Sequence, residues 1–343
     1  MIVRPRYFIE TKDNLFFAVN GYCHPDDYII SFLRYIPDEN GEREYNGKKY
    51  SKVNSSEAYE YISKFHPDYL FLWNVENKKM MGVPKDDIKE IHSPIKRLNE
   101  IRENRDKNEF YEKVALLSDI FHEEADIAFD DMGITGSTLA HLEISDSSDI
   151  DFIVFGLENH RRARNLYGKL KDDPNSVLDR IDEDYWKRVY KKRIHDNSMS
   201  LNEFMWYESR KNNRGLIKGT LFDILSTMNP EELEVSDNLF YRPLGNMKIK
   251  CTIIDDSQSF DTPAIYKIGN LEILEGNPLN IEKIVSYTHT YAGEVQNNEV
   301  VIASGVCEEV TDKSCKEKKY NLVVGTTRES INEYIKLQKN PLR

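Results

Sequence analysis

Cysteine is scarce in this chain of 343 residues, which holds only four. The closest pair, Cys307 and Cys315, has a C-x7-C spacing that matches neither a zinc knuckle nor a dithiol redox motif. We therefore expect four free thiols and no disulfide framework. The sequence also shows no internal repeat of fixed period.

Long apolar runs are missing as well. The longest ones, such as Tyr28 to Leu33 and Phe152 to Phe155, fall far short of the roughly 20 residues that a membrane helix requires. The N-terminal sequence MIVRPRYFIE lacks the apolar segment of a signal peptide. These absences predict a cytoplasmic protein with no membrane partner.

An overall excess of positive charge is absent too, because the formal net charge is -12. Phosphate contacts need a local excess of Lys and Arg, so this charge argues against a protein that coats nucleic acid along its whole surface. One segment differs: from Trp186 to Lys218 the sequence holds nine Lys and Arg against three Asp and Glu. The 39% hydrophobic and 31% charged residues are otherwise typical of a soluble globular protein long enough for two or three domains.

Residues 1–95 predict a small N-terminal α/β domain. Asn46-Gly47 supplies the chemistry of a tight turn, and Ser55 is a plausible helix cap. The expected elements are a strand region at 6–22, helices at 26–36 and 55–65, a turn-rich segment at 37–50 and a linker at 83–97.

Residues 96–245 predict the central domain. A long helix is expected over 97–125, because Phe110, Val114, Leu117 and Phe121 recur at helical spacing. After it we expect a strand ending at Ile134, a turn at 135–137, a short helix at 138–144, a strand at 149–155, helices at 160–172 and 183–194, and a strand region at 214–228.

Residues 246–343 differ in character, because short β-rich runs follow one another without long helices between them. Turn signals such as Glu275-Gly276-Asn277-Pro278 separate these runs. The pattern favours a small, closed or nearly closed β-barrel, capped by a final helix at 329–338.

The chemistry-bearing pattern is Gly136-Ser137 followed by Asp149-Ile150-Asp151 at the head of an apolar run. Carboxylates two residues apart on a strand point to the same face, so Asp149 and Asp151 can share metal ions. Two Mg²⁺ ions about 4 Å apart neutralise the entering and leaving oxygens of a phosphoryl-type transfer. Gly136 allows close approach of the backbone to a triphosphate, and Ser137 can hydrogen-bond to it beside the positive end of a helix. Burying two such carboxylates without a cation would be costly.

This pattern resembles the polymerase-β-like nucleotidyltransferase superfamily, whose signature is a Gly-Ser turn, about a dozen residues, and then Asp-hydrophobic-Asp. The resemblance covers residues 126–156. It implies a multidomain α/β (α+β) protein with a mixed-sheet nucleotidyltransferase core, in which Gly136 and Ser137 bind nucleotide phosphates. Asp149 and Asp151 would bind two Mg²⁺ ions, with Mn²⁺ able to substitute. More loosely, the architecture is similar to a group of archaeal proteins described as predicted nucleotidyltransferases.

The superfamily usually adds a third carboxylate on a later strand, where it helps to deprotonate the attacking hydroxyl. Asp223 is the favoured candidate because it stands alone among apolar neighbours in a strand-like run. Asp255 and Asp256 are alternatives. Absence of a third carboxylate would indicate a weakened or lost activity.

The basic segment has two interpretations: a solvated helix face, or a phosphate-binding face beside the acceptor whose aromatic residues stack on bases. The residues in question are Lys187, Arg188, Lys191, Lys192, Arg193, Arg210, Arg214 and Lys218, with Trp186, Tyr190, Trp206 and Tyr207 interleaved. Arg214 and Lys218 are the preferred nucleotide-binding candidates, because they immediately precede the Asp223 strand. We expect Asp130, Asp131 and Asp146 to be solvated loop carboxylates, and His141 to be a packed or surface histidine rather than a triphosphate ligand.

The sequence thus predicts a magnesium-dependent nucleotidyltransferase that moves a nucleoside monophosphate from a nucleoside triphosphate to an acceptor hydroxyl, with RNA as one candidate acceptor. Two alternatives stay open. One is a catalytically inactive nucleotide- or RNA-binding scaffold, and the other is a regulator that nucleotidylates a protein.

Overall fold

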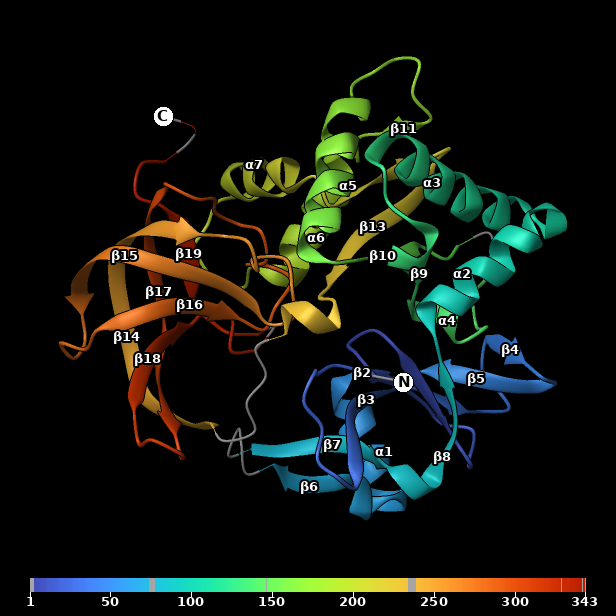
Figure 1. Ribbon diagram of the computed structural model, residues 1–343, viewed down its shortest axis with the longest axis horizontal. Helices are drawn as coiled ribbons and strands as arrows, with labels where there is room; N and C mark the ends of the chain where they lie inside the picture. The colour runs from blue at the N-terminus through green and yellow to red at the C-terminus, as the bar shows by residue number, and fades with distance from the viewer. Residues whose placement is uncertain are drawn as a thin grey trace. The chain divides into compact units, whose positions relative to one another are not determined.

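The protein is mixed α+β with three sheets (Figure 1), as seen in a computed structural model that describes residues 3–73, 78–145, 147–233, 239–327, 329–340 and 342. Packing divides the chain into two compact units. Of the described residues, the first unit holds 3–73, 78–180 and 213–233, and the second holds 181–212 and the described residues from 239 onward. The boundaries predicted at residues 95 and 245 fall inside these units, because the N-terminal residues pack on the central sheet and the segment 181–212 packs with the C-terminal strands.

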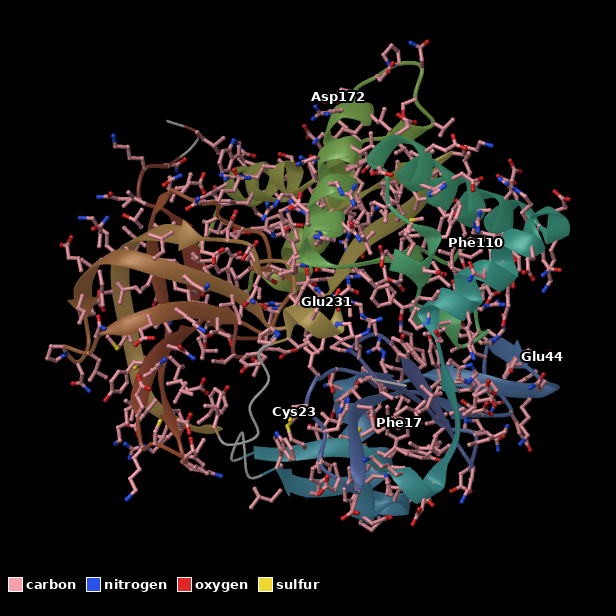
Figure 2. The ribbon with its side chains drawn as sticks, in the orientation of Figure 1. Phe17, Cys23, Glu44, Phe110, Asp172 and Glu231 are labelled. Atoms are coloured by element: carbon pink, nitrogen blue, oxygen red, sulfur yellow. The ribbon has the colours of Figure 1, made fainter. Side chains whose placement is uncertain are left out.

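The N-terminal part of the first unit is an eight-stranded sheet in which β4-β5-β3-β2-β1-β8 form the main path, with β7 on β3 and β6 on β7. Helix α1 (Ser55–Phe65) packs on this sheet through Ala58 and Ile62, and Phe17 (Figure 2) is fully buried in the same core. The strands are β1 (Phe8–Thr11), β2 (Phe16–Val19), β3 (Tyr28–Pro37), β4 (Arg43–Tyr45), β5 (Lys48–Lys52), β6 (Leu70–Trp73), β7 (Lys78–Pro84) and β8 (Ile88–His92).

Several local predictions for this sheet can be compared with the structure. The Asn46-Gly47 turn is confirmed: it joins β4 to β5 with φ values of +49° and +71°, as a type I′ turn requires. The helix at 55–65 is confirmed as well, but its cap is Asn54 rather than a serine. The Asn54 side chain accepts from the N–H of Glu57, whose carboxylate accepts from the N–H of Asn54.

Two predictions for this part are wrong. The segment 26–36 is not a helix but most of β3, whose buried and half-buried residues largely alternate and whose edges pair with β2, β5 and β7. The segment 83–97 is not a linker, because it contains β8 and the start of a helix. Ile88, Ile91 and Ile95 pack against the core, so tertiary contacts order this charged stretch.

The second sheet, in the order β11-β12-β13-β10-β9, carries the predicted motif. Strands β10 and β13 are parallel, and the other pairs are antiparallel. The predicted helix over 97–125 is two helices separated by a 3-10 turn at Arg105–Lys107. The elements are α2 (Pro94–Glu103), α3 (Glu109–Ala125), β9 (Met132–Ile134), α4 (Gly136–Leu139), β10 (Ile150–Phe155), α5 (Leu157–Leu170), β11 (Leu178–Asp179), β12 (Arg214–Ile217) and β13 (Thr220–Thr227).

Strand β10 is buried on both faces, and its two faces have different neighbours. Ile150, Phe152 and Val154 belong to the core formed with helices α2, α3 and α5, which cover one face of the sheet (Figure 1). Ile153 and Phe155 belong to the core of the N-terminal sheet. Because strand residues alternate between faces, Asp151 is on the side of the N-terminal sheet.

The second unit is built on a curled six-stranded sheet (Figure 1), which confirms the predicted β-rich tail in its coarser form. Pairing runs β14-β15-β16-β18-β17, β14 pairs with β17 as well, and β16 and β18 are parallel. The elements are α6 (Glu183–Arg193), α7 (Leu201–Lys211), β14 (Leu239–Asp255), β15 (Ala264–Glu275), β16 (Ile281–Ser286), β17 (Val300–Asp312), β18 (Lys318–Val323) and β19 (Tyr334–Leu337).

The helix predicted at 329–338 is wrong, because this segment contains strand β19. Ile335 is fully buried opposite Ala303, and the strand adds to one edge of β17. None of the helices in the described part of the chain combines the length and the hydropathy that crossing a membrane needs.

Candidate functional site

The sheet brings three of the predicted carboxylates together. Asp151 on β10 and Asp223 on β13 are directly paired in the parallel ladder, so their side chains leave the same face of the sheet. Asp149 lies two residues before Asp151, immediately before β10 begins, and Asp223 is close enough to help raise its pKa. Asp255, by contrast, belongs to the second unit and forms an ion pair with Lys267 at 3.0 Å. The carboxylate that strand pairing places beside the motif is therefore Asp223.

These carboxylates destabilise one another's ionised forms. Burial, followed by the nearby Asp223 and Asp149 carboxylates, raises the pKa of Asp151 from 3.8 to about 6. The pKa of Asp149 is also raised, first by desolvation and then by Asp223. Such a group gains stability when a cation is added, since the cation offsets the repulsion that raises the pKa values.

Arg214 supplies one counter-charge. It is paired with Asp223 across the antiparallel β12–β13 hairpin. Its guanidinium donates from Nε to Asp223 Oδ1 and from Nη2 to Asp223 Oδ2, the latter at 2.6 Å. This fork-like pair is the strongest geometry available to Arg and a carboxylate, and both side chains are mostly buried. Arg214 thus contacts the catalytic candidate Asp223.

Gly136 is the point at which the backbone comes closest to these carboxylates. Its φ is +66°, and a Cβ at this position would lie 1.9 Å from Asp151 Oδ2. The neighbouring Thr135 N–H donates to the Asp151 carbonyl at 2.9 Å, which holds the turn against β10. Glycine is required here both for its conformational freedom and for the space beside the carboxylate.

Ser137 ties the two halves of the motif together. It is buried, and its Oγ donates to Ser148 Oγ at 3.4 Å, while Ser148 Oγ accepts from the N–H of Ile144 at 2.9 Å. The one or two helical turns predicted at 138–144 are present as a single turn that starts earlier, at Gly136, and ends at Leu139, and His141 adopts a left-handed φ of +57°. The positive end predicted at this turn is therefore that of a single helical turn.

His141 faces the N-terminal sheet and not the carboxylates. Its ring stacks on Tyr45, with centroids 5.0 Å apart and planes 13° apart, and it meets His92 at 5.9 Å. Burial and nearby cations lower the pKa of His141 to about 4, so the ring is neutral at pH 7. This confirms the prediction of a packed histidine.

The N-terminal sheet adds cations that sequence reasoning missed. Tyr35 and Lys52 are paired across β3 and β5, and Tyr35 packs with Leu139 and Ala140 around α4. Arg43 donates to the Leu142 carbonyl and lies over the Tyr35 ring at 5.7 Å. These contacts anchor the segment after Gly136-Ser137 to the N-terminal sheet.

Lys52 of the N-terminal sheet interacts electrostatically with the carboxylates Asp149 and Asp151. Desolvation and Arg34 lower the pKa of Lys52, while Asp151 and Asp149 act in the opposite direction. Arg34 is the extra residue at a bulge, since Leu33 and Tyr35 pair with the consecutive residues Phe17 and Phe16. Bulges redirect side chains, and no local signal in the sequence marks this one.

Lys218, Asp130 and Asp131 do not contact the three carboxylates of the candidate site through any interaction seen in the described residues. Lys218 occupies the turn between β12 and β13, and its Nζ pairs with Glu112 of α3 at 3.1 Å. Asp130 and Asp131 belong to a short 3-10 turn in the connection before β9: Asp130 is exposed, as expected of a solvated carboxylate, whereas Asp131 is half-buried and accepts from Asn159 Nδ2 at 3.1 Å. Asp146 lies outside the described residues.

The basic segment of helices α6 and α7 belongs to the second unit. Trp186 and Tyr207 are buried in its core, which contradicts a base-stacking role for these two rings. Several of its charges pair locally: Arg193 with Glu208 at 3.3 Å, and Arg210 with Glu299 at 2.6 Å. The interpretation as a charged helix face is the one that these contacts favour.

Comparison with known proteins gives a family but no activity. No family model matches the chain, and no solved structure matches it. The chain is 41% identical, over 349 aligned positions, to "Uncharacterized protein MJ1086" of Methanocaldococcus jannaschii, covering 99% of this chain and 100% of that protein. At this identity and coverage, the chain belongs to the same protein family as this archaeal relative.

Proposed function

We propose that the protein is a magnesium-dependent nucleotidyltransferase that transfers a nucleoside monophosphate from a nucleoside triphosphate to an acceptor hydroxyl. The observation that carries this proposal is the in-register pairing of Asp151 with Asp223, beside Asp149. Asp151 on one strand, Asp149 just before that strand and Asp223 on the parallel neighbour suit a pair of Mg²⁺ ions that share a carboxylate. The strand, Gly-Ser turn, short helix and strand that precede them support a polymerase-β-like core.

The expected roles follow from position. Asp149 and Asp151 would bind the two metal ions, for which Mn²⁺ could substitute, while Asp223 would bind the ion that activates the hydroxyl and help to remove its proton. The metal supplies charge neutralisation at the α-phosphate. Arg214 donates to both oxygens of Asp223, so a metal ion at Asp223 would either share the carboxylate with this guanidinium or displace it.

The phosphates would be held from two sides. Gly136 and Ser137 offer the backbone of the turn, and Lys52 with Arg34 offers positive charge from the N-terminal sheet. A triphosphate carries several negative charges, which would offset the cost of keeping Lys52 charged where it is partly removed from water. Lys218, which is paired with Glu112, would have to leave that partner to reach a phosphate.

The test uses purified full-length protein with Mg²⁺, each labelled triphosphate in turn, and RNA, small-molecule or protein acceptors. Wild type should release pyrophosphate and label one acceptor class, and Asp149→Asn, Asp151→Asn and Asp223→Asn should each lose at least about 100-fold in rate. Asp130→Asn is a matched control in an exposed loop. Equal rates for wild type and all three motif variants would refute the proposal. Gel separation with nuclease treatment distinguishes RNA from protein products.

A non-catalytic scaffold is the second candidate, and the Arg214–Asp223 fork favours it. In this conformation the guanidinium already binds both oxygens of Asp223 and offsets its charge, which disfavours a metal ion there. This alternative predicts nucleotide binding without turnover, and binding that survives Asp223→Asn. Turnover that is lost in Asp223→Asn would exclude it.

A further inference from the structure

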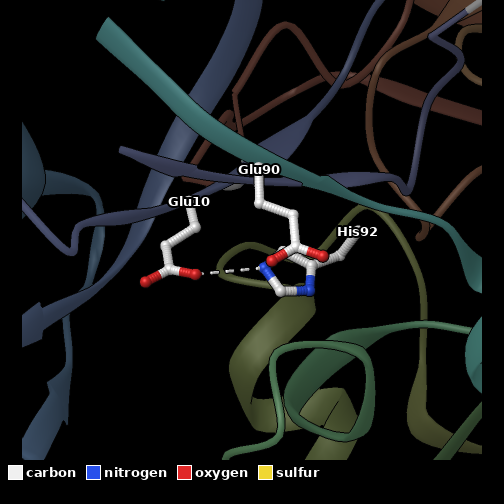
Figure 3. A group of neighbouring side chains, drawn as sticks. All are labelled: Glu10, Glu90 and His92. Atoms are coloured by element: carbon white, nitrogen blue, oxygen red, sulfur yellow. Dashed lines mark ion pairs between the residues drawn. The ribbon is translucent and has the colours of Figure 1, made fainter. Parts of the chain in front are cut away.

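A second cluster of potential ligands lies on the N-terminal sheet. Glu10 of β1 and Glu90 of β8 are directly paired across the antiparallel ladder, and His92 follows Glu90 by two residues on the same face (Figure 3). One ligand atom from each of the three side chains can be chosen so that all lie within 4.8 Å of one another. These residues play no part in the proposed transfer reaction.

The imidazole of His92 is the informative member. His92 is only 6% exposed, and its buried Nε2 makes no hydrogen bond of ordinary length and angle to the described residues, although its proximity lowers the pKa of Glu10 against the effect of burial. This atom points to Glu10 Oε2, as the dashed line in Figure 3 shows, at an ion-pair distance of 3.5 Å. A buried imidazole nitrogen that faces a carboxylate oxygen at this longer separation is compatible with a partner that both atoms could bind.

The separation fits a metal ion better than a direct hydrogen bond. A charge-assisted N–H···O bond measures about 2.7–2.9 Å. Two ligands on one tetrahedral zinc ion, each about 2.0–2.2 Å from the metal, are about 3.4 Å apart. The observed 3.5 Å between Nε2 and Oε2 is close to that edge length.

Neighbouring side chains hold Glu10 and His92 in place, whereas the exposed Glu90 side chain is free to rotate toward a bound ion. Lys89 Nζ binds Glu10 Oε1 at 2.6 Å, which orients the carboxylate and leaves Oε2 toward His92. The His92 ring lies against Phe16 and His141, with centroids 5.6 Å and 5.9 Å away. Glu90 is exposed, so its carboxylate can rotate onto an ion without rearranging the core.

We propose that Glu10, Glu90 and His92 form a binding site for a divalent transition metal ion, with Zn²⁺ as its best chemical fit. One imidazole nitrogen with two carboxylate oxygens suits zinc more than magnesium, which prefers oxygen alone. Three protein ligands leave a fourth position for water. Lys89 supports the Glu10 ligand from outside the metal shell.

The test is a titration of metal-stripped, full-length protein with Zn²⁺ by calorimetry, and with Co²⁺ by its visible absorption. Wild type should bind one high-affinity Zn²⁺ and give the intense absorption of four-coordinate Co²⁺. Glu90→Gln should weaken binding at least about tenfold, and His92→Gln should abolish this absorption. Glu44→Gln and His66→Gln are the controls, since these residues lie outside the cluster, and both should bind like wild type.

Asp151→Asn separates this site from the proposed magnesium site, because it should keep the Zn²⁺ affinity of wild type. Zn²⁺ binding that is lost in Asp151→Asn but retained in Glu90→Gln would overturn the proposal, as would wild-type binding in Glu90→Gln and His92→Gln together. If His92→Gln does not fold, Glu90→Gln decides the outcome, because Glu90 is exposed and its loss leaves the core intact.

Discussion

Replacing Asp151 with Asn should stabilise the metal-free protein while removing its response to Mg²⁺. Burial, followed by the carboxylates of its strand partner Asp223 and of the adjoining Asp149, raises the pKa of Asp151 from 3.8 to about 6. Asn has nearly the same shape without the charge. The substitution therefore removes the repulsion and leaves the contact with Gly136 in place.

The sign and the size follow from the pKa. A folded-state pKa above the unfolded value means that the folded protein holds this proton more tightly. The resulting stabilisation is complete below about pH 4 and is lost as the pH rises through 6. A rise of about two pKa units corresponds to about 3 kcal/mol at 1.36 kcal/mol per unit. Asp151 is only half-buried, so solvent screening reduces the expected effect to about 1–2 kcal/mol.

Urea unfolding at pH 8 in EDTA measures this effect. Asp151→Asn should be more stable than wild type by about 1–2 kcal/mol, and the gap should shrink toward pH 4. Added Mg²⁺ should stabilise wild type and leave the variant unchanged. Asp130→Asn, in an exposed loop, should match wild type under all these conditions. A variant that is equally or less stable than wild type at pH 8 in EDTA would refute the argument from like-charge repulsion.

Three further predictions concern the same site. Gly136→Ala should abolish nucleotide transfer and lower stability, because the new Cβ would lie 1.9 Å from Asp151 Oδ2. Gly219→Ala is the control: it also has a positive φ, +79°, but its Cβ would meet no atom within 4 Å, so it should retain the transfer rate in the same assay. Lys52→Met should weaken triphosphate binding about tenfold or more in a calorimetric titration, while Lys49→Met on the same strand should not. Mg²⁺ affinity should fall by up to about tenfold per pH unit below pH 6, because the ion must displace a proton from Asp151. A Mg²⁺ affinity that does not change between pH 5 and 7.5 would contradict the assignment of Asp151 as a metal ligand.

The placement of the carboxylates was accessible from sequence because it depends on local rules. Residues two apart on a strand share a face, so the D-x-D spacing of Asp149 and Asp151 by itself predicts that the two carboxylates lie close together. Asp223 was identified because a single acid in an apolar run of strand residues is costly unless it has a function or a partner. The structure shows that its partner is Arg214, which the sequence placed nearby but as a phosphate ligand.

The errors have a different origin. Residues 26–36 and 329–338 contain apolar residues compatible with either a helix or a strand, and pairing with distant strands decided both as β. The predicted linker at 83–97 is ordered by isoleucines that contact a sheet assembled from residues far away in sequence. Lys52 and Arg34 were missed for the same reason, since nothing near them in the chain indicates the acidic motif about 100 residues later.

The N-terminal sheet contributes to the candidate site, because its side chains contact the segment that follows Gly136. The motif turn holds two left-handed residues, Gly136 and His141, and such a conformation persists at a non-glycine residue only when its surroundings fix it. Here the surroundings are Tyr45, stacked on the His141 ring, and His92, which meets that ring from the side. A metal ion on His92 would restrain this ring and, through it, the segment that joins Gly136 to Asp149. Stripping Zn²⁺ from the protein should then loosen the segment 137–145 in hydrogen exchange, and Glu90→Gln should need at least about tenfold more Zn²⁺ than wild type to restore its protection.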